Sequence, residues 1–330
     1  MNPRMKSGRK KPNSVTIEVI KMAKKNGILD LIRQTPLVKL DRIASEGVEI
    51  YGKLESIQPG GSVKDRAALQ IIRDAIADGR LKKGQTVIEM TSGNMGAGLA
   101  VVCRQFGCPF IAFMPEGNSP ERIKVLKAFG AEVRLVKQVD GAAGRVTGKD
   151  IAYASEMAKA YAAEIEGYYV DQFNNPSSIK GHLESTGPEI WNDLPELDAF
   201  ITAIGSGGTF LGTSKYLKSI KPDIFCAAVE PEKAAIIKTG RVIDPRHIIQ
   251  GTGYSLVPPH WETALADDII TVSDDEVAEM TRRLSHEQGL FVGYSSGANV
   301  AAALKLWQAN PALKKIVTVL CDSGYKYGSL

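Results

Sequence analysis

The chain has 330 residues, of which 44% are hydrophobic and 24% are charged, and these values exclude fibrous and wholly disordered proteins. No stretch approaches the ~18 consecutive apolar residues of a membrane helix, so we expect a soluble protein without membrane contact. The net charge of +4 is concentrated in residues 1–27, which hold eight Lys or Arg and one acid. The remainder is slightly acidic, so we expect no nucleic-acid partner. The basic N-terminal extension, residues 1–30, lacks the apolar run of a secretory signal, which predicts a cytoplasmic protein.

Beyond this extension, apolar strand-like runs alternate with helical patterns. The predicted strands cover residues 48–55, 86–90, 109–114, 133–137, 198–204, 225–230 and 316–321. The predicted helices cover residues 63–79, 96–107, 119–130, 151–165, 210–220 and 299–309. This alternation predicts an α/β fold with mostly parallel sheets. One sheet domain is expected to end at about residue 169, and a second to begin near Val170.

Cysteine and histidine residues do not form a metal-binding pattern. The four cysteines have no C-x-x-C spacing, and the four histidines form no H-E-x-x-H pair. Cys103, Cys226 and Cys321 lie inside apolar segments, which is typical of reduced core thiols. We therefore expect no metal site.

The first two motifs along the chain lie before predicted helices. In QPGGSVKDRAA (58–68), two glycines free the backbone and Lys64 opens the following helix. Alone, such a lysine is more often a surface charge. In TSGNMG (91–96), small residues follow a strand and expose backbone N–H groups at a helix N-terminus, which suits a carboxylate or a phosphate.

Two further turns have the same strand-turn-helix character. GSGGT (205–209) combines three glycines with the hydroxyls of Ser206 and Thr209, and is the best phosphate cradle in the chain. It has neither the Gly-Lys-Ser/Thr ending of a P-loop nor the third glycine of a dinucleotide fold, which favours a small phosphate group. GYSSGA (293–298) enters a helix with two serines that an N-cap role would also explain. A lysine, two anion-binding loops and a serine turn together suit pyridoxal phosphate chemistry.

In this order, the motifs resemble those of the cysteine synthase and cystathionine β-synthase family, the fold-type II pyridoxal phosphate enzymes. The resemblance extends over about 290 residues and is carried by the segments QTPLVKL (34–40), QPGGSVKDR, TSGNMG, DQFNNP (171–176), GHLESTGPEIW (181–191), GSGGT, IQGTG (249–253), GYSSGA and CDSG (321–324). It implies two three-layer α/β domains with mostly parallel sheets. Residues 63–169 would form a smaller domain that closes on the substrate, and residues 31–62 plus 170–330 a larger cofactor-binding domain.

The resemblance also implies the roles of individual residues. Lys64 would bond to the pyridoxal 5'-phosphate aldehyde and act as the acid and base at the substrate α-carbon. Asn94 would hydrogen-bond the cofactor ring oxygen, and Ser295, with Ser296 as a neighbouring alternative, would face the pyridine nitrogen. The cofactor phosphate would bind Gly205, Ser206, Gly207, Gly208 and Thr209. The substrate would bind Thr91, Ser92, Gly93, Asn94, Met95, Gln172 and Gly251.

The implied reaction is β-replacement on O-acetylserine or O-phosphoserine through an aminoacrylate intermediate, with sulfide giving L-cysteine. Homocysteine or an amine as nucleophile, and β-elimination by a serine or threonine dehydratase, remain alternatives. Met95 replaces the usual threonine of the family's carboxylate loop, and Tyr254 is a further candidate selector. Arg246 is either a surface residue or a partner for a phosphorylated donor. Family members are usually homodimers, so we expect a homodimer acting on small amino-acid substrates.

Overall fold

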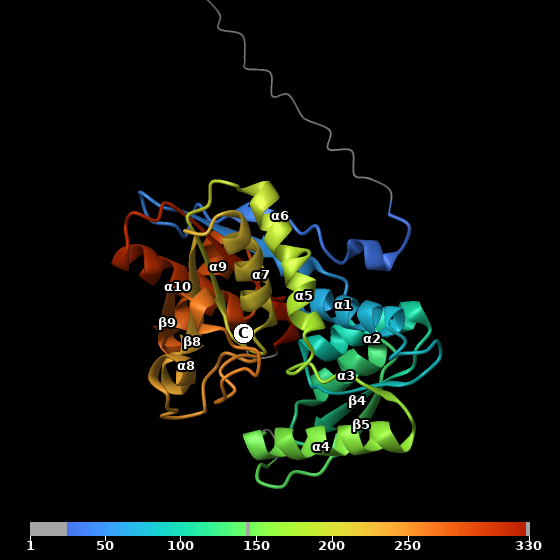
Figure 1. Ribbon diagram of the computed structural model, residues 1–330. Helices are drawn as coiled ribbons and strands as arrows, with labels where there is room; N and C mark the ends of the chain where they lie inside the picture. Colours follow the sequence, from blue (N-terminus) through green and yellow to red (C-terminus); the bar gives the residue numbers. More distant parts are fainter. Residues whose placement is uncertain (1–24, 143–145, 328–330) are drawn as a thin grey trace, which may run out of the picture.

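The structure is a computed structural model that describes residues 25–142 and 146–327. Most of the predicted N-terminal extension (1–30) therefore lies outside the described residues. The described chain folds around two β-sheets, one built mainly from its later part and one from its middle part (Figure 1). The domain boundaries predicted from the sequence remain a prediction.

The larger sheet has six strands in the order β1-β2-β10-β7-β8-β9. These strands are β1 (Leu37–Lys39), β2 (Glu49–Leu54), β7 (Ala199–Ala203), β8 (Phe225–Pro231), β9 (Asp268–Val272) and β10 (Lys315–Leu320). Only the β1-β2 pair is antiparallel among these neighbours. Mostly parallel pairing confirms the expectation from the alternating pattern.

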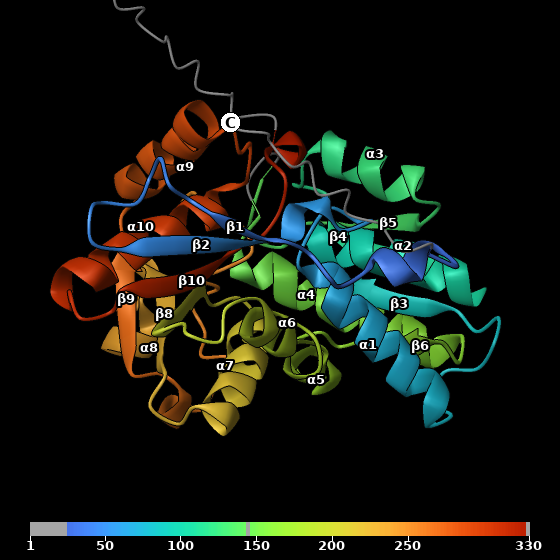
Figure 2. The ribbon, with the colours of Figure 1, turned by 90° about the horizontal axis from the view of Figure 1, so that it is seen from above.

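Helices cover both faces of the larger sheet (Figure 2). The helices that belong to this part are α5 (Ser177–Leu183), α6 (Thr186–Asp193), α7 (Gly208–Ile220), α8 (Ile236–Thr239), α9 (Asp274–Gln288) and α10 (Tyr294–Ala309). Successive strand residues point to opposite faces. Ala199 and Ile201 accordingly join the apolar cluster under α9 and α10, whereas Phe200 joins the cluster under α6 and α7. The larger unit therefore has three layers.

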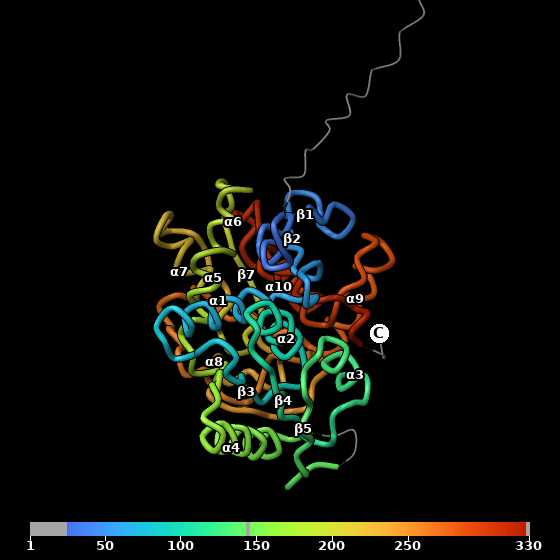
Figure 3. The backbone as a smooth tube through the Cα atoms, turned by 90° about the vertical axis from the view of Figure 1, so that its right-hand side faces the viewer, coloured from blue at the N-terminus to red at the C-terminus, as the bar shows by residue number. Residues whose placement is uncertain are grey.

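The smaller sheet has four parallel strands in the order β5-β4-β3-β6. Its strands are β3 (Val87–Met90), β4 (Phe110–Pro115), β5 (Glu132–Val136) and β6 (Tyr168–Tyr169), and its helices are α1 (Lys64–Ala77), α2 (Asn94–Phe106), α3 (Pro120–Ala128) and α4 (Gly148–Glu164). Helices α1 and α2 pack on one face and α4 on the other (Figure 3). This second three-layer unit confirms the predicted fold class.

Five short 3-10 helices complete the described elements. They span Ile28–Leu31, Glu55–Ile57, Glu232–Ala234, Thr263–Leu265 and Gly324–Lys326. No helix in the described part combines the length and apolarity needed to cross a bilayer. Within residues 25–142 and 146–327, no group of three or more His, Cys, Asp or Glu side chains is arranged to hold a metal ion.

Candidate active site

Lys64 is the first residue of α1 and lies at the carboxyl edge of the larger sheet. The preceding residues fix it there, because Ser62 bridges to Asp322 and the Val63 N–H donates to the Cys321 carbonyl at 2.8 Å. The Lys64 side chain is half-buried, and its amine has no hydrogen-bond or ion-pair partner among the described residues. Burial lowers the pKa of this amine. Lys64 is therefore more available as a nucleophile and base than an exposed lysine.

The predicted phosphate loop joins the carboxyl end of β7 to the start of α7. Gly207 caps the helix with a left-handed φ of 88°. A Cβ on Gly205 would lie 2.3 Å from the Gly251 carbonyl oxygen, so a side chain there requires the backbone to shift. The glycines thus bring two backbone loops into direct contact at a helix N-terminus, where N–H groups are free to bind an anion.

His182 links this loop to Lys64. Its Nε2 lies 3.3 Å from the Thr209 hydroxyl, and its Nδ1 lies 2.8 Å from the Thr186 hydroxyl. Burial, the Arg66 guanidinium and the nearby Lys64 amine hold the pKa of His182 well below its usual value. The imidazole is therefore neutral at physiological pH. Helix α5, which carries His182, packs on both α1 and α7, the helices that begin at Lys64 and at the phosphate loop.

The predicted carboxylate loop follows β3 and enters α2. The Thr91 hydroxyl accepts a hydrogen bond from the Gly96 N–H at 3.1 Å, so it closes the first turn of α2. The Ser92 hydroxyl accepts from the Arg122 guanidinium at 3.1 Å. Met95 is only 3% exposed and packs in the apolar cluster of the smaller unit. An effect of the Met95 side chain on the substrate pocket therefore stays a prediction.

Asn94 binds the C-terminal segment, residues 322–327. Its Nδ2 donates to Asp322 Oδ2 at 2.7 Å, and its Oδ1 accepts from Lys326 Nζ at 2.7 Å. Lys326 also donates to the Gly60 carbonyl at 2.8 Å. An amide has two N–H donors and two lone pairs, so Asn94 keeps one of each for a ligand. The sequence analysis did not predict these partners of Asn94. The polar segment Asp-Ser-Gly-Tyr-Lys-Tyr (322–327) was the feature of the sequence that pointed to them.

Tyr327 completes this segment, because its hydroxyl donates to Asp322 Oδ2 at 2.6 Å. Replacing it with Phe removes one hydrogen bond to a buried carboxyl group. We expect Tyr327→Phe to lower the free energy of unfolding by about 1–3 kcal/mol, measured by urea denaturation. Tyr325→Phe is the matched control, since Tyr325 is 88% exposed. Equal stability of the two variants would contradict this role of Tyr327.

Gln172 lies beside a buried carboxyl group that the sequence analysis also missed. Its Nε2 is 3.3 Å from Glu89 Oε1 and 3.4 Å from the Met90 carbonyl oxygen. Burial raises the pKa of Glu89 to about 8, so the group is protonated at neutral pH. Glu89 Oε2 has no hydrogen-bond partner among the described atoms. Gln172 Nε2 donates to both Glu89 Oε1 and the Met90 carbonyl, so these two groups hold the Gln172 side chain beside the residue that precedes the carboxylate loop.

The raised pKa of Glu89 predicts a pH-dependent stability. Between its ordinary value of 4.5 and about 8, the folded protein keeps a proton that the unfolded chain releases. The free energy of unfolding therefore falls as pH rises, by about 1.4 kcal/mol per pH unit for this proton. Glu89→Gln should remove this contribution, so that the free energy of unfolding of the variant falls less steeply with pH. Above pH 8 the variant should be more stable than wild type. Urea denaturation from pH 5 to 9 measures this, and parallel curves would refute it.

Ser295 and Ser296 open α10, and the structure separates their environments. Ser296 is fully buried, and its hydroxyl accepts from the Cys321 N–H at 2.9 Å. The Ser295 hydroxyl contacts the Cys321 thiol, whose pKa burial raises to about 12. Cys321 lies near the Lys64 amine, so both serines lie close to the predicted lysine, and the choice of Ser295 for the pyridine nitrogen stays a prediction.

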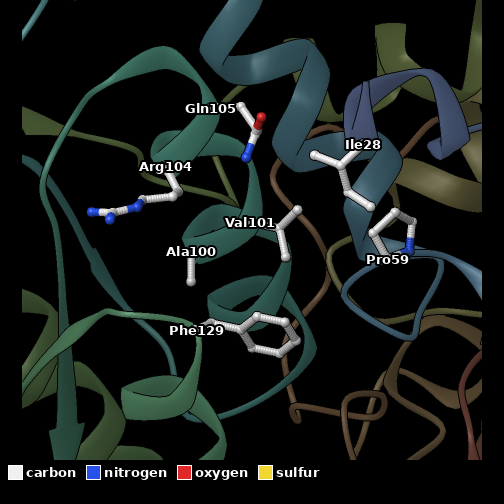
Figure 4. A pocket seen from close by; sticks show the side chains of 7 residues that line it. All are labelled: Ile28, Pro59, Ala100, Val101, Arg104, Gln105 and Phe129. Atoms are coloured by element: carbon white, nitrogen blue, oxygen red, sulfur yellow. The ribbon is translucent and has the colours of Figure 1, made fainter. Parts of the chain in front are cut away.

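Arg246, Tyr254 and a surface cavity were further candidates for a functional role. Arg246 is exposed and pairs with Asp244 at 2.7 Å, which identifies it as a surface residue. Tyr254 packs edge to face with Phe173, with ring centroids 5.3 Å apart. A cavity of about 250 Å³ on the outer side of α2 contains none of the predicted site residues (Figure 4). Its lining residues are Ile28, Pro59, Ala100, Val101, Arg104, Gln105 and Phe129.

The residues present fit a pyridoxal phosphate group. A half-buried lysine amine without a partner in the described chain, a glycine loop at a helix N-terminus and a neutral serine are the groups that its aldehyde, phosphate and pyridine nitrogen require. Strands β10 and β7 are parallel neighbours, so their carboxyl ends lie at the same edge of the larger sheet. Lys64, the loop 205–209 and Ser295 lie at that edge.

Comparisons with known proteins agree with this arrangement. Residues 28–322 match the family model described as pyridoxal-phosphate dependent enzyme. An O-ureido-L-serine synthase from Streptomyces lavendulae is 38% identical over 92% of this chain and 90% of its own length. A cysteine synthase from Staphylococcus aureus is 38% identical over 92% and 95%. The crystal structure of an O-acetylserine dependent cystathionine beta-synthase from Helicobacter pylori superposes with a TM-score of 0.84, at 35% identity over 94% and 99%.

Proposed function

This chain belongs to the family of pyridoxal-phosphate dependent enzymes and is an enzyme of the cysteine synthase type, and on that premise we propose that it makes L-cysteine from O-acetylserine and sulfide. O-phosphoserine is the alternative donor. The observation that carries the proposal is the Lys64 amine, which is half-buried, without a partner among the described residues, and adjacent to the phosphate loop through His182.

Each part of the cofactor has a group to hold it. The loop 205–209 would bind its phosphate, Lys64 its aldehyde carbon, Ser295 its pyridine nitrogen and Asn94 its ring oxygen. When bound, pyridoxal phosphate supplies an electron sink that acidifies the substrate α-proton and allows the β-substituent to leave. The hydroxyl of Ser295 is neutral and does not keep the pyridine nitrogen protonated, which favours loss of a β-substituent over prolonged charge delocalisation in the ring.

Lys64 would carry the proton in this reaction. Its lowered pKa increases the fraction of neutral amine at physiological pH, and only the neutral amine accepts a proton from the α-carbon. The same proton returns to the α-carbon after the nucleophile has added at the β-carbon. Thr91, Ser92 and Gln172 would hold the substrate carboxylate meanwhile, so that the α-proton faces the amine.

Relatives of similar identity carry the names O-ureido-L-serine synthase and cysteine synthase, so the nucleophile requires a direct test. We would incubate the purified enzyme with O-acetyl-L-serine and sulfide, homocysteine or an amine, and identify the products by mass. The proposal expects cysteine from sulfide at the highest kcat/KM. Pyruvate and ammonia formed at the same rate with and without nucleophile would instead establish β-elimination.

We also propose a cytoplasmic homodimer that acts on small amino-acid substrates. The free state of all four cysteines supports a reducing compartment. Large apolar side chains such as Ile57 and Phe129 are 59% and 37% exposed, which supports a protein contact. Light scattering after size-exclusion chromatography measures the oligomeric state, and a monomer at micromolar concentration would contradict the dimer.

A further inference from the structure

Arg122 is a half-buried cation beside the carboxylate loop, and it has no role in the β-replacement proposed above. It lies in the first turn of α3, the helix that follows β4 in the chain. Its guanidinium donates to the Ser92 hydroxyl at 3.1 Å and to Asn118 Oδ1 at 3.3 Å, and it contacts Gln250 Oε1. All three partners are neutral, and Arg122 has no carboxylate partner within the described residues.

The hydrogen-bond partners of Arg122 leave its charge only partly compensated. A cation in the first turn of a helix is repelled by the positive end of the helix dipole. Burial adds a desolvation cost that neutral hydroxyl and amide oxygens offset only in part. Arg246, by contrast, is exposed and makes a bidentate pair with Asp244. Arg122 therefore has unused capacity for an oxyanion, and its planar fork matches a carboxylate or a phosphate.

The contacts of Arg122 connect the two units beside the predicted site. Ser92 belongs to the carboxylate loop of the smaller unit, and Gln250 belongs to the larger unit and precedes Gly251. The Gly251 carbonyl in turn contacts Gly205 of the phosphate loop. The charge of Arg122 also acts on the Tyr254 hydroxyl and on Asp322. The guanidinium thus hydrogen-bonds Ser92, a predicted ligand of the substrate carboxylate, on the side where the two units meet.

We propose that Arg122 binds the oxyanion that leaves the substrate β-carbon, acetate or phosphate. This inference rests on the proposed β-replacement. In that reaction the β-carbon–oxygen bond breaks, and its electron pair leaves with the oxygen of the acetyl or phosphoryl group. Sulfide then forms the new carbon–sulfur bond, and Lys64 returns the α-proton. Arg122 neutralises the charge that develops on the departing oxygens, and so it selects donors whose leaving group is an oxyanion.

The test compares three donors in the complete, cofactor-loaded enzyme with saturating sulfide: O-acetyl-L-serine, O-phospho-L-serine and β-chloro-L-alanine. Chloride leaves without an oxygen for the guanidinium fork to bind. We expect Arg122→Gln to lower kcat/KM by about 10- to 100-fold for the donor with the natural leaving group and by less than about 3-fold for β-chloro-L-alanine. The donor with the larger loss of kcat/KM in Arg122→Gln, O-acetyl-L-serine or O-phospho-L-serine, identifies whether Arg122 binds acetate or phosphate.

Two further variants sharpen the comparison. Arg122→Lys keeps the charge without the planar fork and should fall between wild type and Arg122→Gln. Arg246→Gln removes an exposed arginine and should match wild type with every donor. Circular dichroism and thermal unfolding establish that each variant is folded. Equal losses on all three donors would overturn the proposal, because they would show that Arg122 only positions Ser92 or the two units.

A binding measurement distinguishes failure of this inference from failure of the proposed function. In the loaded enzyme the phosphate loop is filled, so added inorganic phosphate or acetate reports on the carboxylate loop and on Arg122. We expect one of these anions to raise the unfolding temperature of wild type by more than that of Arg122→Gln. An equal response of both proteins would overturn the role of Arg122. A wild-type enzyme inactive in β-replacement with all three donors would overturn the proposed function, whatever the anion response.

Discussion

Lys64→Ala should abolish β-replacement and remove the visible absorbance that the cofactor gains on bonding to a lysine amine. The substitution removes both the nitrogen that holds the aldehyde and the group that moves the α-proton. We expect kcat to fall by at least about 10³-fold, the range seen when a general base or nucleophile is removed. Steady-state assays with O-acetyl-L-serine and sulfide measure the rate, and absorbance spectra measure the bonded cofactor.

The neighbouring structure predicts that this variant still folds. The Lys64 amine makes no hydrogen bond or ion pair with any described residue, so its loss leaves no buried partner unsatisfied. Lys233→Ala provides the control, because Lys233 is half-exposed and its amine forms a surface ion pair with Asp274. Retention of the absorbance band in Lys64→Ala would show that another amine holds the cofactor, and the proposed function would then lose its central observation.

The parts of the site that could be predicted from the sequence are the loops formed by consecutive residues. A strand, a glycine-rich turn and a helix follow one another within about 20 residues at both 86–107 and 198–220, and their geometry is a local property. The capping box of Ser273 and Glu276 was also readable, yet α9 and the short strand β9 before it were not predicted. Strand β9 is the edge strand of the described sheet and pairs with β8, so its formation as a strand depends on that partner.

The missed residues depend on contacts between distant segments. Asn94 and Asp322 are separated by 228 positions, and they meet because β10 lies beside β2 in the larger sheet while residues 322–327 reach across to α2. Arg122 and Gln250 likewise belong to different units, and only the packing of the two units brings them into contact. Nothing in the local pattern around Arg122 distinguishes it from a surface arginine. Sheet order, which periodicity alone does not specify, decides which polar side chains share the site.

The close approach of two loops at Gly205 leads to the second prediction. A Cβ at this position would lie 2.3 Å from the Gly251 carbonyl oxygen, a backbone atom that is not free to rotate away. Gly205→Ala therefore forces the phosphate loop or the loop at 251 to shift, at a cost of about 1–3 kcal/mol. If the N–H groups of the phosphate loop move with it, cofactor affinity should fall by about 10- to 100-fold. Titration of cofactor-stripped protein with pyridoxal phosphate measures the Kd.

Gly148→Ala is the matched control for this experiment, because a Cβ at Gly148 has no neighbour within 4 Å among the described residues and the substitution lies at the start of α4, on the far face of the smaller sheet. It should bind pyridoxal phosphate as wild type does. Because Gly205 contacts the cofactor phosphate and not its aldehyde in this proposal, Gly205→Ala should bind pyridoxal without phosphate as tightly as wild type. A loss of affinity for pyridoxal equal to the loss for pyridoxal phosphate would place the phosphate elsewhere.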